Sequence, residues 1–308
     1  SLFETPIASL PLPEGVIEKA PPFEKSAYAG KGAVSEWQGR VIAYEPGVIA
    51  KKTLYKKFHV LNENGLSQLK ESTINFNPLN ERVYINRLVV FDREGKQVGE
   101  GNLGQYYISD RGDDVIVNEE KTLHIPIPGL EVGGSFELIL TVEILGQKDV
   151  YPFEAVNLAG LFPHHNAFLS LRGNPSDFQY TTGSHTIDQV VLENEIVWVS
   201  HNPPVYERKD YLPYYTLSLP TIWISSATGK SWKDLAVKYA EELSEYLEAD
   251  EEAAGIAASL QVENAPDREK IEAVADYLAT HFEYKALNFG YRASIPHPVG
   301  EIVTNRFG

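Results

Sequence analysis

Two groups of polar residues have side chains that bind metal ions in other proteins. His164 and His165 are adjacent, but no carboxylate or third histidine follows closely, and a zinc site needs three or four converging ligands. We therefore expect these histidines in a solvent-exposed loop. Residues 110–114 carry three carboxylates around Gly112. They lack the alternating oxygen ligands and distal glutamate of a calcium loop, so we expect a charged hairpin tip.

Acid–base chemistry has one further candidate group, His185 with Asp188 and Glu193. No serine or cysteine in a nucleophile-elbow pattern accompanies it, so the group has no attacking atom. The chain contains no cysteine at all, which excludes thiolate catalysis, thiolate metal sites and disulfides within these residues. We therefore predict no catalytic residue, metal site or cofactor in residues 1–308.

Aromatic residues are frequent between residues 206 and 232. Such rings can stack on sugars or hold an extended peptide, because they offer a large amphipathic contact area. Packing between domains is the more frequent role of such clusters. The candidate ligand-binding residues are Tyr206, Tyr211, Tyr214, Trp223 and Trp232.

The charge balance excludes several kinds of partner. The 308 residues include 27 Lys and Arg against 43 Asp and Glu, a formal net charge of −16. This excess repels phosphates, so nucleic acids and anionic lipid surfaces are poor candidates. No apolar run is long enough to span a membrane, and residues 1–6 do not resemble a signal peptide. If the protein is exported, we expect its signal to have been removed.

The elements that must position these residues are predicted to be mainly strands. Residues 1–26 contain five prolines and predict an extended leader. Residues 27–225 consist of short runs rich in Val, Ile, Tyr, Phe and Thr, separated by turns such as 62–65 and 92–95. Strands at this spacing predict an antiparallel β-sandwich.

Residues 226–308 show helical rather than strand periodicity. Ser231 and Asp234 have the spacing of an N-terminal capping pair, followed by apolar residues at every fourth position. A second helix is expected after Pro266, with an apolar stripe at Ile271, Val274, Ala275 and Leu278. The predicted fold is therefore mainly β, with a sandwich followed by a short helical segment.

This helical segment resembles the beginning of a bacterial transglutaminase-like domain of the papain-like superfamily. The similarity rests on Tyr277–Tyr284, Gly290-Tyr291, Pro296, Pro298, Glu301–Val303 and Asn305–Gly308. In that family a turn of the type R-[YF]-G-D-C places the catalytic cysteine at the start of a helix, where the helix dipole favours a thiolate. Arg306-Phe307-Gly308 is similar to the first part of that turn, so the resemblance implies a cysteine beyond residue 308. His281, Glu283 and His297 match no catalytic position of the family.

The β region resembles DUF3857, a domain that commonly precedes transglutaminase-like domains. The matching segments are Glu63–Gly65, Tyr84–Arg87, Phe91–Gly95, Pro203–Glu207, Leu212-Pro213, Ile222-Trp223 and Ser231–Ala236. The resemblance implies a location in the periplasm or at the bacterial cell envelope.

Three functional hypotheses follow. In the first, residues 1–308 are a non-catalytic accessory module of a transglutaminase-like envelope protein, which binds a protein, peptide or glycan by β-edge or groove contacts. In the second, they belong to an active cysteine peptidase or amidase whose Cys, His and Asp lie beyond residue 308. In the third, they form a carbohydrate-binding sandwich unrelated to an enzyme. In each case the residues themselves should show no enzyme activity.

Overall fold

The chain forms two compact units in the computed structural model. The structure describes residues 2–45, 48–111, 116–145, 153–183, 186–207, 211, 219–226, 229–244, 246–248, 251–284, 286–288 and 297–307. The β unit consists of residues 1–109 and 121–228, and the helical unit of residues 110–120 and 229–308.

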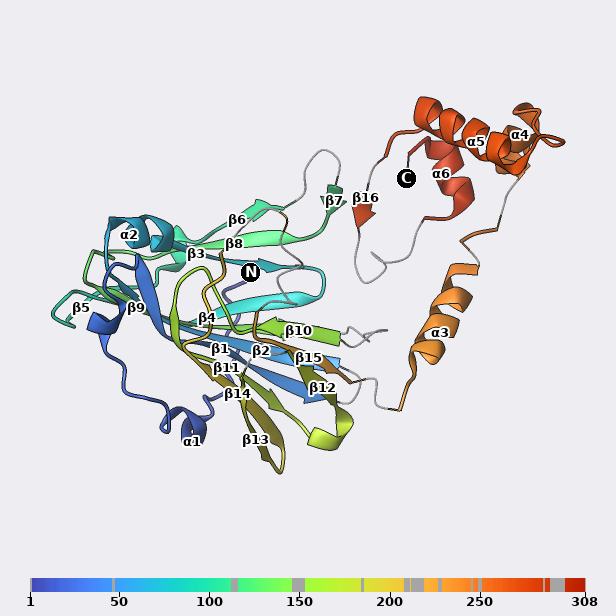
Figure 1. The fold of residues 1–308 in the computed structure, drawn as a ribbon. Coiled ribbons are helices and arrows are strands. Elements are labelled where there is room, and N and C mark those ends of the chain that lie inside the picture. Colours follow the sequence, from blue (N-terminus) through green and yellow to red (C-terminus); the bar gives the residue numbers. More distant parts are fainter. Residues whose placement is uncertain are drawn as a thin grey trace. The chain divides into compact units, whose positions relative to one another are not determined.

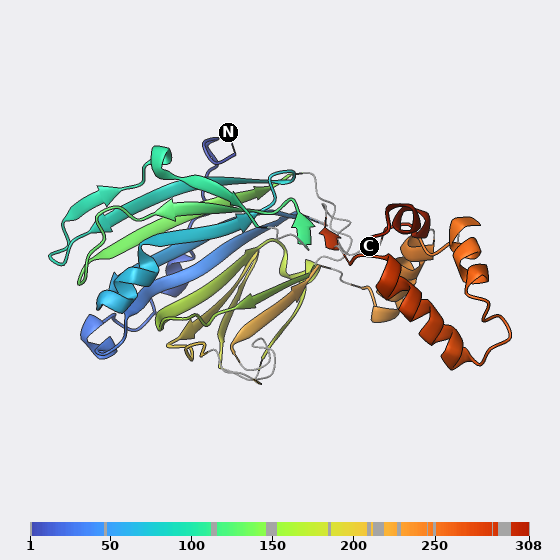
Figure 2. The same cartoon turned by 90° about the horizontal axis from the view of Figure 1, so that it is seen from above.

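A large central sheet organises the β unit (Figure 1). Its strand order is β13-β14-β11-β1-β2-β9-β4-β5. The strands are β1 (Ala33–Glu45), β2 (Val48–Val60), β4 (Glu81–Phe91), β5 (Gln97–Glu100), β9 (Ser135–Ile144), β11 (His164–Arg172), β13 (Asp188–Leu192) and β14 (Glu195–His201). All neighbouring pairs are antiparallel except β1 and β11, which run parallel. Figure 2 shows these strands from a second direction.

Two smaller sheets cover one face of the central sheet and complete the sandwich. Their orders are β3-β8-β6 and β10-β15-β12. The strands are β3 (Glu71–Phe76), β6 (Tyr107–Asp110), β8 (Lys121–Pro126), β10 (Phe153–Asn157), β12 (Gln179–Thr182) and β15 (Thr221–Ser225). Because side chains alternate along a strand, one set faces this layer. Phe58 and Leu138 pack with Leu123 in one core, and Trp198 packs with Ile222 in a second core. The mainly β sandwich predicted from the sequence is confirmed.

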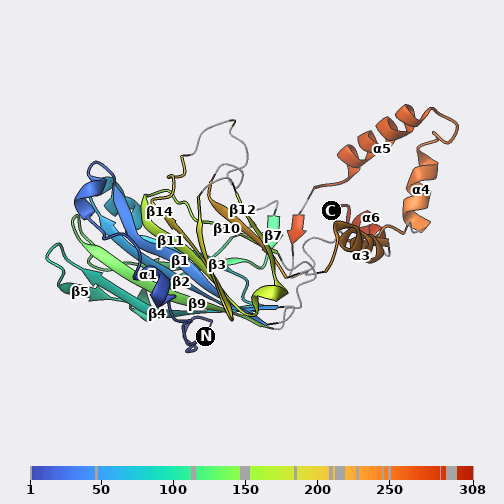
Figure 3. The ribbon, with the colours of Figure 1, turned by 60° about the horizontal axis from the view of Figure 1, so that its bottom comes forward.

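The leader lies against the opposite face of the central sheet. Leu10, Leu12, Val16 and Ile17 pack on a third buried cluster that includes Val41, Tyr55, Phe168, Val197 and Val199. The leader is not extended throughout, because α1 (Glu14–Ile17) and a 3-10 turn at Lys25–Tyr28 interrupt it. Figure 3 shows α1 in blue beside the strands of this sheet.

The helical unit contains α3 (Trp232–Ser244), α4 (Glu251–Ser259), α5 (Asp267–His281) and α6 (Val299–Asn305). The predicted capping pair forms, since the Ser231 amide donates to Asp234 Oδ2 (2.7 Å) and the Asp234 amide donates to Ser231 Oγ (3.2 Å). These bonds satisfy amides at the start of α3, and the bond donated by the Ser231 amide lowers the pKa of the Asp234 carboxyl. A short parallel pair joins β7 (Ile116–Asn118) to β16 (Ala286–Asn288).

The turn predicted at residues 62–65 is wrong. Asn62 instead caps α2 (Glu63–Leu69), with its side chain accepting a hydrogen bond from the Gly65 amide. A Cβ atom at Gly65 would lie 1.8 Å from the carbonyl oxygen of Gly32. The glycine therefore permits close backbone contact between α2 and the start of β1. In the sequence alone, such a glycine looks like a turn glycine. The predicted turn at residues 92–95 is present, with Gly95 at φ +83°.

Candidate functional site

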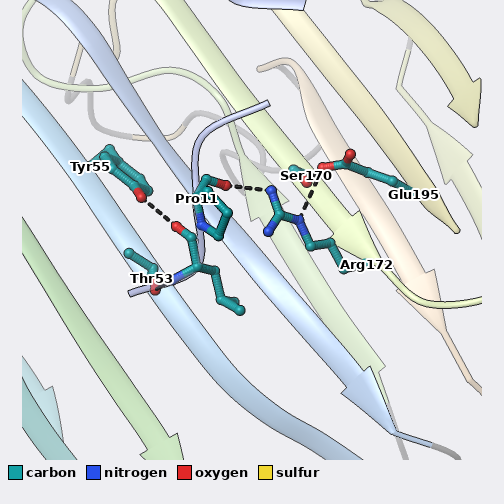
Figure 4. A network of polar contacts seen from close by, with 7 residues as sticks. Pro11, Thr53, Tyr55, Ser170, Arg172 and Glu195 are labelled. Carbon is teal, nitrogen blue, oxygen red and sulfur yellow. Dashed lines mark hydrogen bonds and ion pairs between the residues drawn. The ribbon is translucent and has the colours of Figure 1, made fainter. Parts of the chain in front are cut away.

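Side chains of the central sheet hold the leader by its backbone (Figure 4). The Leu10 amide donates to Thr53 Oγ1 (2.9 Å), and the Tyr55 hydroxyl donates to the Leu10 carbonyl. Arg172 donates to the Pro11 carbonyl. Two further bonds reach the leader, from Asn86 Nδ2 to the Ile7 carbonyl (2.7 Å) and from Lys51 Nζ to the Ala8 carbonyl (3.2 Å). This face of the sheet therefore binds an extended chain through main-chain groups.

Arg172, on β11, connects the leader to Glu195 on β14. Its Nε lies 3.3 Å from Glu195 Oε1, and Ser170 Oγ donates to the same oxygen. Glu195 is thus held between a cation and a hydroxyl, which fixes the direction of the guanidinium. Burial raises the pKa of the Tyr55 hydroxyl, so this group remains a neutral donor to the leader.

A hollow of about 450 Å³ lies beside this network, between the leader and β13. The leader lines it with Leu12–Val16 and Lys19. The sheet lines it with Asp188, Val190, Leu192, Glu195, Val199 and His201. The charged lining residues are Glu14, Lys19, Asp188 and Glu195. The Glu195 carboxylate is already paired with Arg172, which leaves two carboxylates and one ammonium group. The hollow therefore favours a ligand that is apolar in part and positively charged.

The wall formed by β13 has the features of a docking strand. β13 pairs with β14 on one side and is the last strand in the order of the central sheet, so its other side is an edge among the strands that the structure describes. Val190 and Leu192 are 38% and 48% exposed. An open edge offers backbone donors and acceptors to an added strand, while apolar side chains at alternate positions contact the side chains of that strand.

His201 places an imidazole ring in the lining of this hollow. Its Nδ1 lies 2.5 Å from Asn166 Oδ1, and its Nε2 lies 3.8 Å from Asp188 Oδ2. No group of three or more potential metal ligands occurs among the residues that the structure describes.

Of the five aromatic residues predicted to bind ligand, the four that the structure describes do not line this hollow. The amide of Tyr206 donates to the Gly160 carbonyl (2.8 Å), and Trp223 is a partly buried residue of β15. Tyr211 is fully exposed and Trp232, at the start of α3, is 87% exposed. Tyr214 lies outside the described residues. Their role in ligand binding therefore stays a prediction.

The expectation of an exposed loop at His164 and His165 is wrong. Both residues belong to β11 and are 2% and 6% exposed. This strand lies between β1 and β14 with both faces covered, so polar residues are buried there. His165 is satisfied, with Nδ1 2.9 Å from the Tyr28 hydroxyl and Nε2 2.8 Å from the Pro21 carbonyl.

The other polar candidates have local partners or fall outside the description. His281 Nδ1 lies 2.9 Å from the Tyr277 carbonyl, and His297 lies 3.5 Å from Glu301. Arg306 contacts the Phe282 ring and the Tyr277 hydroxyl, so these three residues pack together within the helical unit. Residues 112–115 and His185 lie outside the described residues.

The sequence alone indicates only some features of the hollow and of the residues that bind the leader. The run of three apolar residues at 190–192, between Gln189 and Glu193, indicates a strand, but not that it is an edge strand. The alternating polar residues Lys51, Thr53 and Tyr55 indicate a polar face of β2. Their hydrogen bonds to the leader backbone join residues about 43 positions apart in the chain, which no local pattern reveals.

Similarity to known proteins is consistent with this architecture. The fold is that of a mainly β sandwich joined to a helical unit. The profile of DUF3857, a domain of unknown function with a solved structure, matches residues 50–204. The chain therefore belongs to the DUF3857 family. No curated protein matches the sequence.

One solved structure has a clearly similar fold. It is a "putative protease" from Parabacteroides distasonis, with 14% sequence identity and a TM-score of 0.72. The match covers 90% of this chain and 56% of that protein, so this chain spans a little over half its length. An M1 zinc metallopeptidase from Deinococcus radiodurans matches at 9% identity over 63% of this chain and 42% of its own. Its TM-score of 0.30 supports no argument.

Proposed function

We propose that residues 1–308 form a non-catalytic accessory module of a transglutaminase-like protein of the cell envelope, and that this module binds an extended peptide beside β13. The hollow next to an exposed strand edge is the observation that carries the binding role. The peptide would add a strand to β13, place apolar side chains against Val190 and Leu192, and place basic side chains near the carboxylates.

Two observations support the transglutaminase-like part of the proposal. The Parabacteroides distasonis protein, described as a protease, shares the fold over 90% of this chain. The apolar stripe of α5 is also exposed, with Ile271 at 68%, Val274 at 43% and Leu278 at 46%. Such a face is typical of a helix that packs against further parts of a domain. In the alternative, an active cysteine peptidase or amidase, the same helices lead to a nucleophile that these cysteine-free residues do not supply.

Fluorescence anisotropy tests the binding role with a labelled valine-lysine hexapeptide that carries valine, lysine and valine at positions 1, 3 and 5 and threonine between them, so that the apolar and basic side chains share one face of the added strand. We expect saturable binding to the wild-type chain and a loss of at least roughly tenfold in Val190→Asp, because a carboxylate then interrupts the apolar wall. Val98→Asp is the matched control, since Val98 is 48% exposed on β5, the opposite edge strand of the same sheet. Equal losses in both variants, or no binding to the wild type, would exclude the β13 site.

Peptide cleavage by the full-length protein tests the parent activity. We expect cleavage that is abolished by substitution of a single cysteine outside residues 1–308, and no cleavage by residues 1–308 alone. Cleavage by residues 1–308 would contradict the accessory role. Persistent cleavage after every cysteine is replaced would contradict the transglutaminase-like assignment.

A further inference from the structure

A polar seam separates the two cores of the sandwich. On the face of the central sheet that meets the smaller sheets, Gln38 lies opposite Lys56, and Arg40 lies opposite Leu54. Lys52 follows on the same face of β2. A cavity of about 40 Å³ lies in this seam, lined by Gln38–Arg40, Leu54–Lys56, Val156–Ala159, Ala167 and Phe168.

The seam contains more cations than anions. Lys52 Nζ lies 3.0 and 3.1 Å from the two carboxylate oxygens of Glu154, and Arg40 lies 3.6 Å from the same carboxylate. Lys56 has a different environment, since its ammonium donates to Ser72 Oγ at 3.1 Å. No carboxylate of the described residues lies within ion-pair distance of Lys56. Among the described residues, the seam thus holds three cationic side chains and one carboxylate, which contacts only Lys52 and Arg40.

This charge imbalance is accompanied by lowered pKa values in two buried groups, Lys56 and His164. Burial and the charge of Arg40 lower the pKa of Lys56. Burial and the charge of Lys56 lower the pKa of His164 to about 4, and neither ring nitrogen of His164 has a hydrogen-bond partner. A buried cation without a counter-ion is unfavourable because the protein interior does not replace its hydration.

We propose that the cavity between Arg40 and Lys56 is a binding site for a small carboxylate. A water molecule needs at least about 10–15 Å³ of such space, so 40 Å³ accommodates the three heavy atoms of a carboxylate group. Arg40 and Lys56 both line the cavity, so an anion bound there would lie beside two cationic side chains and balance the excess positive charge. The side chain of Arg40 is 35% exposed, which gives the cavity a side toward solvent.

The ligand can be a free carboxylate or the carboxyl terminus of a peptide, because both present the same group. Sodium formate, a tripeptide with a free carboxyl terminus and the same tripeptide with an amidated terminus distinguish these sources. Formate binding alone indicates a free small acid. Binding of the free tripeptide but not its amide indicates recognition of a chain terminus. Binding of neither formate nor the free tripeptide overturns the proposal.

Thermal denaturation at constant ionic strength measures the effect. We expect formate to raise the Tm of the wild-type chain in a saturable manner, and its apparent affinity to fall at least roughly tenfold in Lys56→Met. Lys57→Met is the matched control, because Lys57 is the next residue on β2 but pairs with Glu36 outside the cavity. An equal response in all three proteins would show only a general salt effect and overturn the proposal.

A second measurement does not depend on whether Lys56→Met folds. In the wild-type chain, NMR titration of the Lys56 ammonium should show a higher pKa in saturating formate than in an equal concentration of chloride. Arg40→Gln should reduce this rise while leaving the fold intact, since Arg40 is partly exposed. An unchanged Lys56 pKa in formate would overturn the proposal.

Discussion

The buried imidazole of His164 makes the stability of the β unit sensitive to acid. His164 begins β11 and is 2% exposed, and its pKa is lowered from 6.5 to about 4 by burial and by the charge of Lys56. The unfolded chain therefore binds a proton at a pH where the folded chain does not. Stability from this group is fully present above about pH 6.5 and is lost as the pH falls toward 4.

The magnitude follows from the difference between the two pKa values. Each pKa unit corresponds to about 1.4 kcal/mol, so the full loss on acidification is about 3 kcal/mol. At pH 5 the loss is about 2 kcal/mol, because the folded state is still largely unprotonated there. Other groups also titrate in this range, so the contribution of His164 is the difference between the wild type and a variant without the ring.

Urea denaturation of the wild type and His164→Leu at pH 7.5 and pH 5 isolates this contribution. Leucine has a similar volume and removes two ring nitrogens that have no partner. We expect the wild type to lose about 2 kcal/mol more than His164→Leu between the two pH values. Equal losses in the two proteins would refute the reasoning. An NMR pKa for His164 near 6.5 would refute it independently of any variant.

Three further predictions concern the leader and the cores. Arg172→Met should increase hydrogen exchange of the Leu10 amide roughly tenfold, since the leader loses a charged bond to the sheet; unchanged exchange would show that Arg172 does not hold it. Trp198→Ala should lower the free energy of unfolding by about 3–5 kcal/mol, because the ring is fully buried, and a loss below about 1 kcal/mol would contradict that packing. Gly39→Ala should cost about 1–3 kcal/mol in urea denaturation, because its Cβ would lie 2.4 Å from the Phe168 carbonyl oxygen, and an unchanged midpoint would contradict this contact.

The β-sandwich and the helices were predictable because their signals are local. Short β-rich runs between turns indicate strands, and the Ser231 and Asp234 pair indicates the start of α3. The parallel pairing of β1 with β11 was not predictable. It joins Ser35 to His164 across more than a hundred residues and inserts β11 into the centre of the sheet.

That long-range pairing also explains the main error about polar residues. His164 and His165 follow Pro163 and look like part of a loop, but pairing with β1 and β14 buries them. The hollow beside β13 has a similar origin, since it forms where the leader meets strands more than 170 residues later in the chain. Motif spacing indicates the family, whereas such contacts locate the candidate binding site.

Hydrogen exchange on the wild-type chain, with and without the valine-lysine hexapeptide, tests the proposed binding role most directly. If the peptide adds a strand at the edge of the central sheet, backbone amides within Asp188–Leu192 should become protected, while those of β5 should not change. Protection elsewhere, with β13 unaffected by a peptide that binds, would contradict the account.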